Sequence, residues 1–146
     1  MAQVILDGVN AIDQMFHDLG EIPWAVTSDA LEAMTAVAQQ KVRASGESMG
    51  VRDKNPDSQV HVLDKITRTK PKQTENGGRC DVTFRGTRTR GRTRTREAEI
   101  AFINEYGKRG QPARPFIRQA AEQGADEIAA PGEKIIGDWF EKTAKG

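Results

Sequence analysis

The sequence predicts an α+β fold, in which N-terminal helices and a C-terminal helix pack on a small antiparallel sheet with a projecting Arg/Thr β-hairpin. Apolar residues recur at helical spacing over residues 5–46 and again over 115–143. Between them, residues 62–96 alternate in the manner of strands and contain a Gly-rich turn. A chain of 146 residues is large enough to bury one core, so we expect residues 1–146 to form a single domain.

The N-terminal region predicts two helices that are separated by Pro23. The apolar pattern of the first helix ends at Gly20. In the second, Asp29 and Glu32 have the spacing of a capping box, and Gly46 is a natural stop. The apolar stripes are Ile5, Val9, Ile12, Phe16 and Leu19 in the first helix, and Leu31, Met34, Ala38 and Val42 in the second.

The middle of the chain predicts a loop followed by short strands. Residues 47–60 are polar and we expect them to form the loop. Residues 62–70 predict a strand, and residues 75–78 (Glu-Asn-Gly-Gly) predict a turn. The alternation of Cys80, Val82 and Phe84 then predicts a further strand.

Residues 86–96 carry an arginine at every second position, interleaved with threonine and one glycine. These arginines are Arg88, Arg90, Arg92, Arg94 and Arg96. A strand repeats every two residues and Thr favours strands, so the pattern predicts a β-hairpin that meets something anionic. The arginines have the same parity as the packed residues Val82 and Phe84. We therefore expect the hairpin to leave the sheet, or to bulge at Gly86, and to project as an arm.

The turn of this arm decides where its charge lies. An even turn at Arg90 and Gly91 sets Arg88 opposite Thr93 and spreads the arginines over both faces. An odd turn centred on Gly91 sets Arg88 opposite Arg94, which costs repulsion unless an anion faces the arginines. We expect a solvated arm to adopt the even turn, and an arm that grips DNA or an acidic neighbouring subunit to tolerate the odd turn.

The C-terminal part of the chain predicts two helical regions. Residues 98–106 are apolar and could form a strand or a helix, and the spacing of Phe102 and Tyr106 favours the helix. Residues 115–143 form the longer region. Its apolar residues are Phe116, Ile117, Ala120, Ile128, Ile135, Ile136, Trp139 and Phe140. Pro115 suits a first helical turn, where its missing N–H has no partner. We expect Pro131 and Gly132 to break or kink this helix.

The nearly neutral total charge of +1 hides a segregation of sign. Residues 1–40 carry six acidic and no basic residues (−6), residues 41–96 carry fifteen basic and six acidic residues (+9), and residues 97–146 carry seven basic and nine acidic residues (−2). Oppositely charged regions in one chain suit head-to-tail assembly. No apolar run approaches the roughly 20 residues of a membrane span, and the single Cys80 excludes an internal disulfide, so we expect a non-membrane protein of a reducing cytoplasm.

Few residues suggest catalysis. Cys80 and His61 could form a dyad, but the placement of Cys80 in a predicted strand favours a packed thiol. Asp13, His17 and Glu21 are four apart and could hold a metal on a helix face, although a solvated polar face is the favoured interpretation because Gly20 ends the helix. We therefore expect no enzymatic activity, no cofactor and no metal.

A motif in the C-terminal third combines an aromatic-Gly turn with an Ala-Arg-Pro-Phe helix start. Its residues are Asn104, Glu105, Tyr106, Gly107, Pro112, Ala113, Arg114, Pro115, Phe116, Ile117, Arg118, Gln119 and Ala120. This run resembles the signature of a phage tail-component family of the head-tail joining gene cluster of long-tailed double-stranded DNA phages. The resemblance covers about residues 98–121, and the arginine arm lies outside it. In purely physical terms Phe116 is expected in the core, and Arg114 is either a solvated residue or a functional one.

The resemblance implies a structural virion protein, a tail-completion or neck subunit that joins the phage tail to the head connector. It implies a homo-oligomeric ring, expected to be hexameric, around the channel through which genomic DNA passes. Head-completion or connector proteins and tail-terminator or tail-tube proteins would be its neighbours. The protein would be assembled in the host cytoplasm and located in the tail or neck of the virion.

Two alternatives remain open at the level of the sequence. A nucleic-acid-binding accessory protein would use the arginine arm against phosphates, and its affinity would fall steeply with salt. A tail-assembly chaperone would be absent from purified particles. We expect a monomer in dilute solution, and an arm that contacts an acidic surface of a neighbouring subunit in preference to DNA. Charge reversal of Arg88, Arg92 and Arg94 is then expected to block tail joining while the monomer stays folded.

Overall fold

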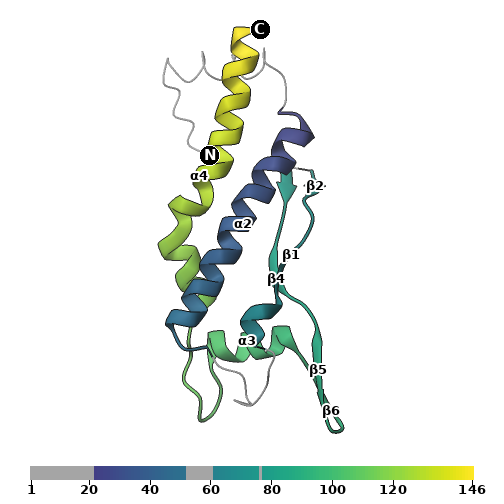
Figure 1. Cartoon of the computed structure of the whole chain (residues 1–146), viewed down its shortest axis with the longest axis vertical. Helices are drawn as coiled ribbons and strands as arrows, with labels where there is room; N and C mark the ends of the chain where they lie inside the picture. Colours follow the sequence, from purple (N-terminus) through teal and green to yellow (C-terminus); the bar gives the residue numbers. More distant parts are fainter. Residues whose placement is uncertain (1–21, 52–60, 76) are drawn as a thin grey trace, which may run out of the picture.

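The fold is taken from a computed structural model that describes residues 22–51, 61–75 and 77–146 (Figure 1). Within these residues it has the predicted α+β composition, with helices and antiparallel strand pairs. The predicted first helix, residues 5–19, lies outside the described residues. The elements are α2 (Trp24–Ser48), η1 (Val62–Lys65), β1 (Ile66–Arg68), β2 (Lys72–Thr74), β3 (Gly77–Arg79), β4 (Val82–Phe84), β5 (Thr87–Arg90), β6 (Thr93–Arg96), α3 (Glu97–Tyr106) and α4 (Phe116–Lys145).

Helices α2 and α4 form the long axis of the molecule and run side by side in opposite directions (Figure 1). Glycines on α4 let the two helices approach closely. Gly132 is buried against the side chain of Met34, and a Cβ at Gly124 would lie 3.3 Å from the stem of Lys41. Lys41 also forms an ion pair with Glu127 of α4. The small residues of α4 therefore set the packing distance in this helix pair.

Helix α2 is longer than the sequence predicts at both ends. It begins at Trp24 directly after Pro23, without a side-chain cap, so the predicted capping box at Asp29 and Glu32 is wrong. It also continues through Gly46 to Ser48, so the predicted stop is wrong. Gly46 is buried there against the side chain of Leu63, and a Cβ at this position would lie only 2.6 Å from Cδ2 of Leu63. This glycine serves close packing, and tertiary contacts maintain the helix past it.

The predicted loop therefore starts later than residue 47, and the part at 52–60 lies outside the described residues. The strand predicted over residues 62–70 is shorter, because its first half forms the 3-10 helix η1. The side chain of His61 caps this helix: its Nδ1 accepts a hydrogen bond from the backbone N–H of Leu63 at 3.1 Å. A local cap thus diverts the start of the strand.

The described strands form three separate antiparallel pairs, where the sequence analysis predicts a single small sheet. β1 pairs with β4, β2 with β3 and β5 with β6. Thr74 is paired with Gly77, so the chain reverses within the predicted turn region, but Gly77 and Gly78 belong to β3 and not to the turn. β1 and β4 lie beside α2 and contribute Ile66 and Phe84 to the apolar interior.

The core lies where the C-terminal end of α2 meets the start of α4. Phe116 is fully buried, as predicted, and the Phe84 ring packs edge-on against it with centroids 6.0 Å apart. The buried cluster consists of Val42, Val51, Val62, Leu63, Ile66, Ala101, Phe116 and Ala120. Because α2, η1, β1, α3 and the start of α4 all contribute to it, this cluster holds β1 to the three helices.

Two helices complete the fold, and both were predicted. α3 corresponds to the helix expected over residues 98–106 and lies across the end of the α2 and α4 pair (Figure 1). α4 begins one residue after Pro115 and runs through Pro131, so the predicted break is wrong. The neighbouring Gly132 packs against α2, and this contact offsets the hydrogen bond that Pro131 cannot donate. None of the described helices is both long enough and apolar enough to cross a membrane.

Candidate functional site

The arginine arm is a two-stranded hairpin with an even turn. Arg88 pairs with Thr95, Thr89 with Arg94 and Arg90 with Thr93, which places Gly91 and Arg92 in the turn. The turn therefore has an even number of residues, as in the first alternative, but it lies one residue closer to the C-terminus than the predicted turn at Arg90 and Gly91. Gly91 has a φ of 59°, as the first central residue of a type II′ hairpin turn requires. The odd turn, which would gather the arginines on one face, is not adopted.

The arm separates from the packed strands, as predicted. β4 ends at Phe84, and β5 begins at Thr87 after Gly86, whose φ is 109°. The backbone N–H of Glu97 donates to the carbonyl oxygen of Gly86 at 3.0 Å and closes the base of the hairpin. Figure 1 shows β5 and β6 projecting past α3 at the end of the molecule. The arm is therefore an extension whose tip is free of the core.

The register distributes the arginines over two faces. Residues opposite each other share a face, so Arg94 and Arg96 lie with Thr87 and Thr89. The side of the hairpin that carries Arg88 bears the threonines of β6 instead. The predicted set of five arginines is therefore divided by the fold and does not act as one surface.

Arg88 belongs to the body of the protein. Its Nε donates to Oε1 of Glu97 at 2.6 Å and its Nη2 donates to Oε2 at 2.9 Å. The Glu97 side chain is 1% exposed and the Arg88 side chain 21%. Such a bidentate pair in a shielded site is strong and geometrically specific. Arg88 thus anchors the arm to α3. Of the arm arginines whose side chains are described, Arg92, Arg94 and Arg96 are exposed.

Next to the arm, α3 presents an aromatic face to solvent. Phe102 is 61% exposed and Tyr106 62%, and their rings contact each other at a centroid distance of 4.7 Å. They are four residues apart and therefore lie on one side of the helix. The buried side of the same helix carries Ala101, Asn104 and Glu105. A solvent-facing aromatic pair on a short helix marks an interaction site.

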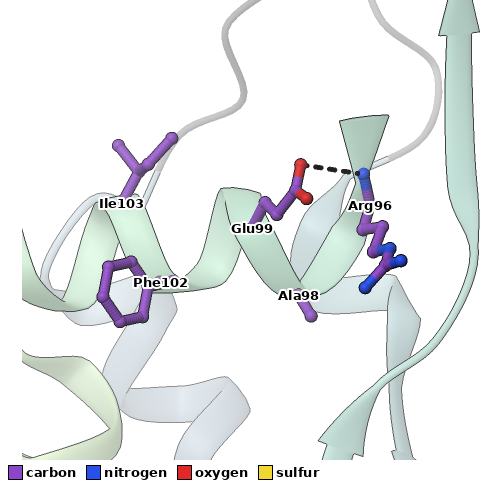
Figure 2. A pocket seen from close by; sticks show the side chains of 5 residues that line it. All are labelled: Arg96, Ala98, Glu99, Phe102 and Ile103. Atoms are coloured by element: carbon purple, nitrogen blue, oxygen red, sulfur yellow. Dashed lines mark hydrogen bonds between the residues drawn. The ribbon is translucent and has the colours of Figure 1, made fainter. Parts of the chain in front are cut away.

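A shallow hollow joins the aromatic face to the arm (Figure 2). Its volume is about 460 Å³, and Arg96, Ala98, Glu99, Phe102 and Ile103 line it. Figure 2 shows Phe102 and Ile103 at one end and Arg96 at the other. Glu99 accepts a hydrogen bond from the backbone N–H of Arg96 at 3.4 Å, so its carboxylate is directed to the start of α3.

A second hollow of about 280 Å³ continues onto the arm. Thr87, Arg94, Arg96 and Glu99 line it. We refer to Arg94, Arg96, Ala98, Phe102 and Tyr106 together as the α3–arm surface. This surface combines exposed cations with exposed aromatic rings, and Glu99 is the carboxylate that lines both hollows. It suits an acidic partner that also carries apolar side chains.

The residues of the motif between Asn104 and Ala120 meet in the elbow between α3 and α4. Glu105 is buried, and its carboxylate accepts the backbone N–H groups of Ile117 at 2.8 Å and Arg118 at 3.1 Å. These groups belong to the first turn of α4 and have no partner within the helix. A carboxylate there also interacts favourably with the helix dipole. Glu105 therefore fixes the start of α4 relative to α3.

Backbone geometry explains the rest of the elbow. Gly107 has a φ of 77°, and a Cβ at this position would lie 2.8 Å from the backbone nitrogen of Ala113. The backbone N–H of Arg114 donates to the carbonyl oxygen of Asn104 at 2.6 Å. Only glycine fits where the chain turns back on itself so closely. Of the motif residues, Phe116 lies in the core and Tyr106 lies on the exposed face.

The residues considered for catalysis have other partners. The Cys80 Sγ donates to the carbonyl oxygen of Thr69 at 3.0 Å. His61 uses Nδ1 as the cap of η1, and its Nε2 lies 3.1 Å from the carbonyl oxygen of Val51. Asp13, His17 and Glu21 lie outside the described residues. Within the described part of the chain, no three His, Cys, Asp or Glu side chains are grouped so that they could hold a metal ion.

Sequence reasoning missed two parts of this site. It did not identify Glu97 as the partner of Arg88, although Glu97 is the first residue after the arginine segment. It used the spacing of Phe102 and Tyr106 only as evidence for a helix. The structure buries the polar pair Asn104 and Glu105 on the opposite side of the helix, and this is why the aromatic side faces solvent. The two polar residues themselves were the available signal in the sequence. Comparisons of the chain with models of protein families, with curated proteins and with solved structures found no match.

Proposed function

We propose that this chain is a structural virion protein, a tail-completion or neck subunit that joins a phage tail to the head connector as a ring around the DNA channel. The observation that carries the proposal is the elbow between α3 and α4. There the motif residues that suggested the tail-component family perform linked tasks, with Glu105 capping α4 and Gly107 permitting the reversal. The motif thus corresponds to one physical unit of the fold.

The surface of the molecule supports the same proposal. A ring of identical subunits needs two unlike surfaces that fit each other. The α3–arm surface is cationic and aromatic, whereas residues 1–40 carry six acidic residues and no basic residue. The α3–arm surface and the start of α2 lie at opposite ends of the molecule in Figure 1. Complementary charges on different parts of one chain favour head-to-tail association, and closure of such contacts gives a ring.

Purified particles of the encoding phage test the proposal. Quantitative mass spectrometry should detect the protein in the particle at about six copies, as expected for a small closed ring. Antibody labelling should locate it between head and tail. Absence from purified particles, with presence in the lysate, would instead support a tail-assembly chaperone.

A nucleic-acid-binding accessory protein is the second candidate, and the exposed Arg92, Arg94 and Arg96 favour it. The even turn weighs against it, since it divides the arginines between two faces. Titration of duplex DNA at two salt concentrations separates the candidates. Tight binding that falls steeply with salt supports the nucleic-acid reading, because contacts to phosphates release counterions. Ring formation without DNA supports the structural one.

A further inference from the structure

We infer that the α3–arm surface binds the N-terminal segment, residues 1–21, of a second copy of this chain. The inference deepens the proposed ring and rests on it, because it names the contact that would link one subunit to the next.

The surface needs a partner that is acidic and amphipathic. Arg94 and Arg96 are exposed on one face of the arm, and the rings of Phe102 and Tyr106 are each more than half exposed. Burying the arginines without carboxylates would leave their charge uncompensated. Burying the rings requires apolar side chains on the same partner. Duplex DNA presents phosphates on its outside and apolar base edges only within its grooves, whereas an amphipathic helix carries carboxylates and apolar side chains side by side.

The N-terminal segment has both properties. It contains four acidic residues and no lysine or arginine. These acidic residues are Asp7, Asp13, Asp18 and Glu21. Its apolar residues recur at alternating four- and three-residue steps over residues 5–19, which predicts a helix with one apolar stripe. A helix of this kind can place its stripe on the aromatic pair while its acidic residues reach the arginines beside it.

The segment enters the fold at the wrong end to reach the surface of its own chain. It precedes Trp24, whereas α3 lies at the other end of α2 (Figure 1). A helix of 25 residues is about 37 Å long. If residues 5–19 are helical and the short link to Trp24 is extended, the middle of the segment stays within about 25 Å of Trp24. The middle of the stripe then falls short of the far end of α2, so we assign the stripe on this surface to a second copy of the chain.

A photo-crosslinking amino acid placed at position 102 tests the contact in the full chain. Copies labelled with heavy isotopes are mixed with unlabelled copies, both at high concentration and within assembled particles. The inference predicts cross-links between labelled and unlabelled chains that map to residues 1–21. A crosslinker at Ala121, which is exposed on α4, is the matched control and should not capture that segment. Cross-links from position 102 only within one chain, to DNA, to another segment, or to nothing would overturn the inference.

Two complementary variants give a second readout. One chain carries Asp13→Lys and Asp18→Lys, which remove acidic charge from the N-terminal segment. The other carries Arg94→Glu and Phe102→Ser, which remove a cation and an aromatic ring from the α3–arm surface. Each variant alone should lose self-association by at least about tenfold. Their mixture should form a dimer and stop there, because one intact segment meets one intact surface. The exposed substitution Lys72→Glu should leave association unchanged.

The two proposals fail separately. If the protein is absent from particles but the intermolecular cross-link forms, the proposed function is wrong and the contact stands. If the protein is present at the neck but position 102 captures a different segment, the contact is wrong and the function stands. A mixture of the two complementary variants that grows beyond a dimer would also contradict the contact, because only one segment and one surface in it are intact.

Discussion

Arg88 and Glu97 form a bidentate ion pair in which two hydrogen bonds, of 2.6 Å and 2.9 Å, hold the arm against the first residue of α3. The Glu97 side chain is almost completely buried, and Arg88 is the cation that pairs with its carboxylate. The pair separates the arginines by role. One arginine is part of the folded body, and the exposed ones remain for a partner.

Removal of Arg88 is expected to destabilise the fold. Arg88→Ala leaves the buried carboxylate of Glu97 without its cation, which should lower the free energy of unfolding by about 3 kcal/mol. The exposed Arg92→Ala is the control and should change it by less than about 0.5 kcal/mol. Urea denaturation measures both. The double variant Arg88→Met and Glu97→Leu should recover most of the loss, and equal stability of Arg88→Ala and the wild type would show that the pair contributes nothing.

Charge reversal must therefore spare Arg88. We expect the triple variant Arg92→Glu, Arg94→Glu and Arg96→Glu to keep the melting temperature of the monomer, because these side chains are exposed. Tail joining should be blocked in this variant. Adding Arg88→Glu should unfold the protein, since it places two carboxylates together in a shielded site. Normal particle assembly by the triple variant would reduce the arm to a solvated loop.

Glu105 is expected to stabilise the elbow through the start of α4. Glu105→Ala leaves the backbone N–H groups of Ile117 and Arg118 unpaired and should cost about 1 to 2 kcal/mol. Glu122→Ala, on the exposed side of α4, is the matched control and should be neutral. Thermal denaturation followed by circular dichroism compares the two. A neutral Glu105→Ala would mean that water replaces the cap at no cost.

Substitutions of Gly107 and Gly110 distinguish the cost of steric crowding from the cost of a strained backbone conformation. Gly107 and Gly110 have φ values of 77° and 80°, but only Gly107 is crowded, with backbone atoms of Gln111 and Ala113 within 3 Å of a Cβ. Gly110→Ala should cost about 1 kcal/mol, and Gly107→Ala should cost at least about twice as much. Their denaturation midpoints give the comparison. Equal midpoints would show that the elbow widens freely.

The second half of α4 is expected to be necessary for folding. Truncation before Pro131 removes Gly132, which packs on Met34, and the edge-on ring pair of Trp139 and Phe140. The loss of apolar burial should amount to several kcal/mol, so the truncated chain should be poorly folded by near-ultraviolet circular dichroism. Removal of residues 144–146, which are exposed, is the control. An unchanged melting temperature of the longer truncation would identify this half of α4 as a docking segment for a neighbour.

The sequence was most informative where one local rule acted alone. The spacing of residues 98–106 predicted α3, and the parity of the arginine segment predicted that the arm leaves the sheet at Gly86. Both depend on periodicity, which a sequence displays directly.

It failed where packing competed with local preference. Gly46 and Pro131 both suggest helix ends, yet both lie inside helices. At Gly46 the close contact with Leu63 stabilises the continued helix, and beside Pro131 the contact of Gly132 with Met34 does the same. The pair of Arg88 with Glu97 was also beyond prediction. Arg88 turns inward because Glu97 lies beside it at the base of the arm, and periodicity alone does not display such a contact.

Electron microscopy of particles assembled without this protein tests the central claim most directly. If the chain is a tail-completion or neck subunit, interruption of its gene should leave DNA-filled heads and completed tails unjoined in the lysate. Supplying the protein from a plasmid should restore joined particles. Joined particles of normal number and appearance in its absence would contradict the account.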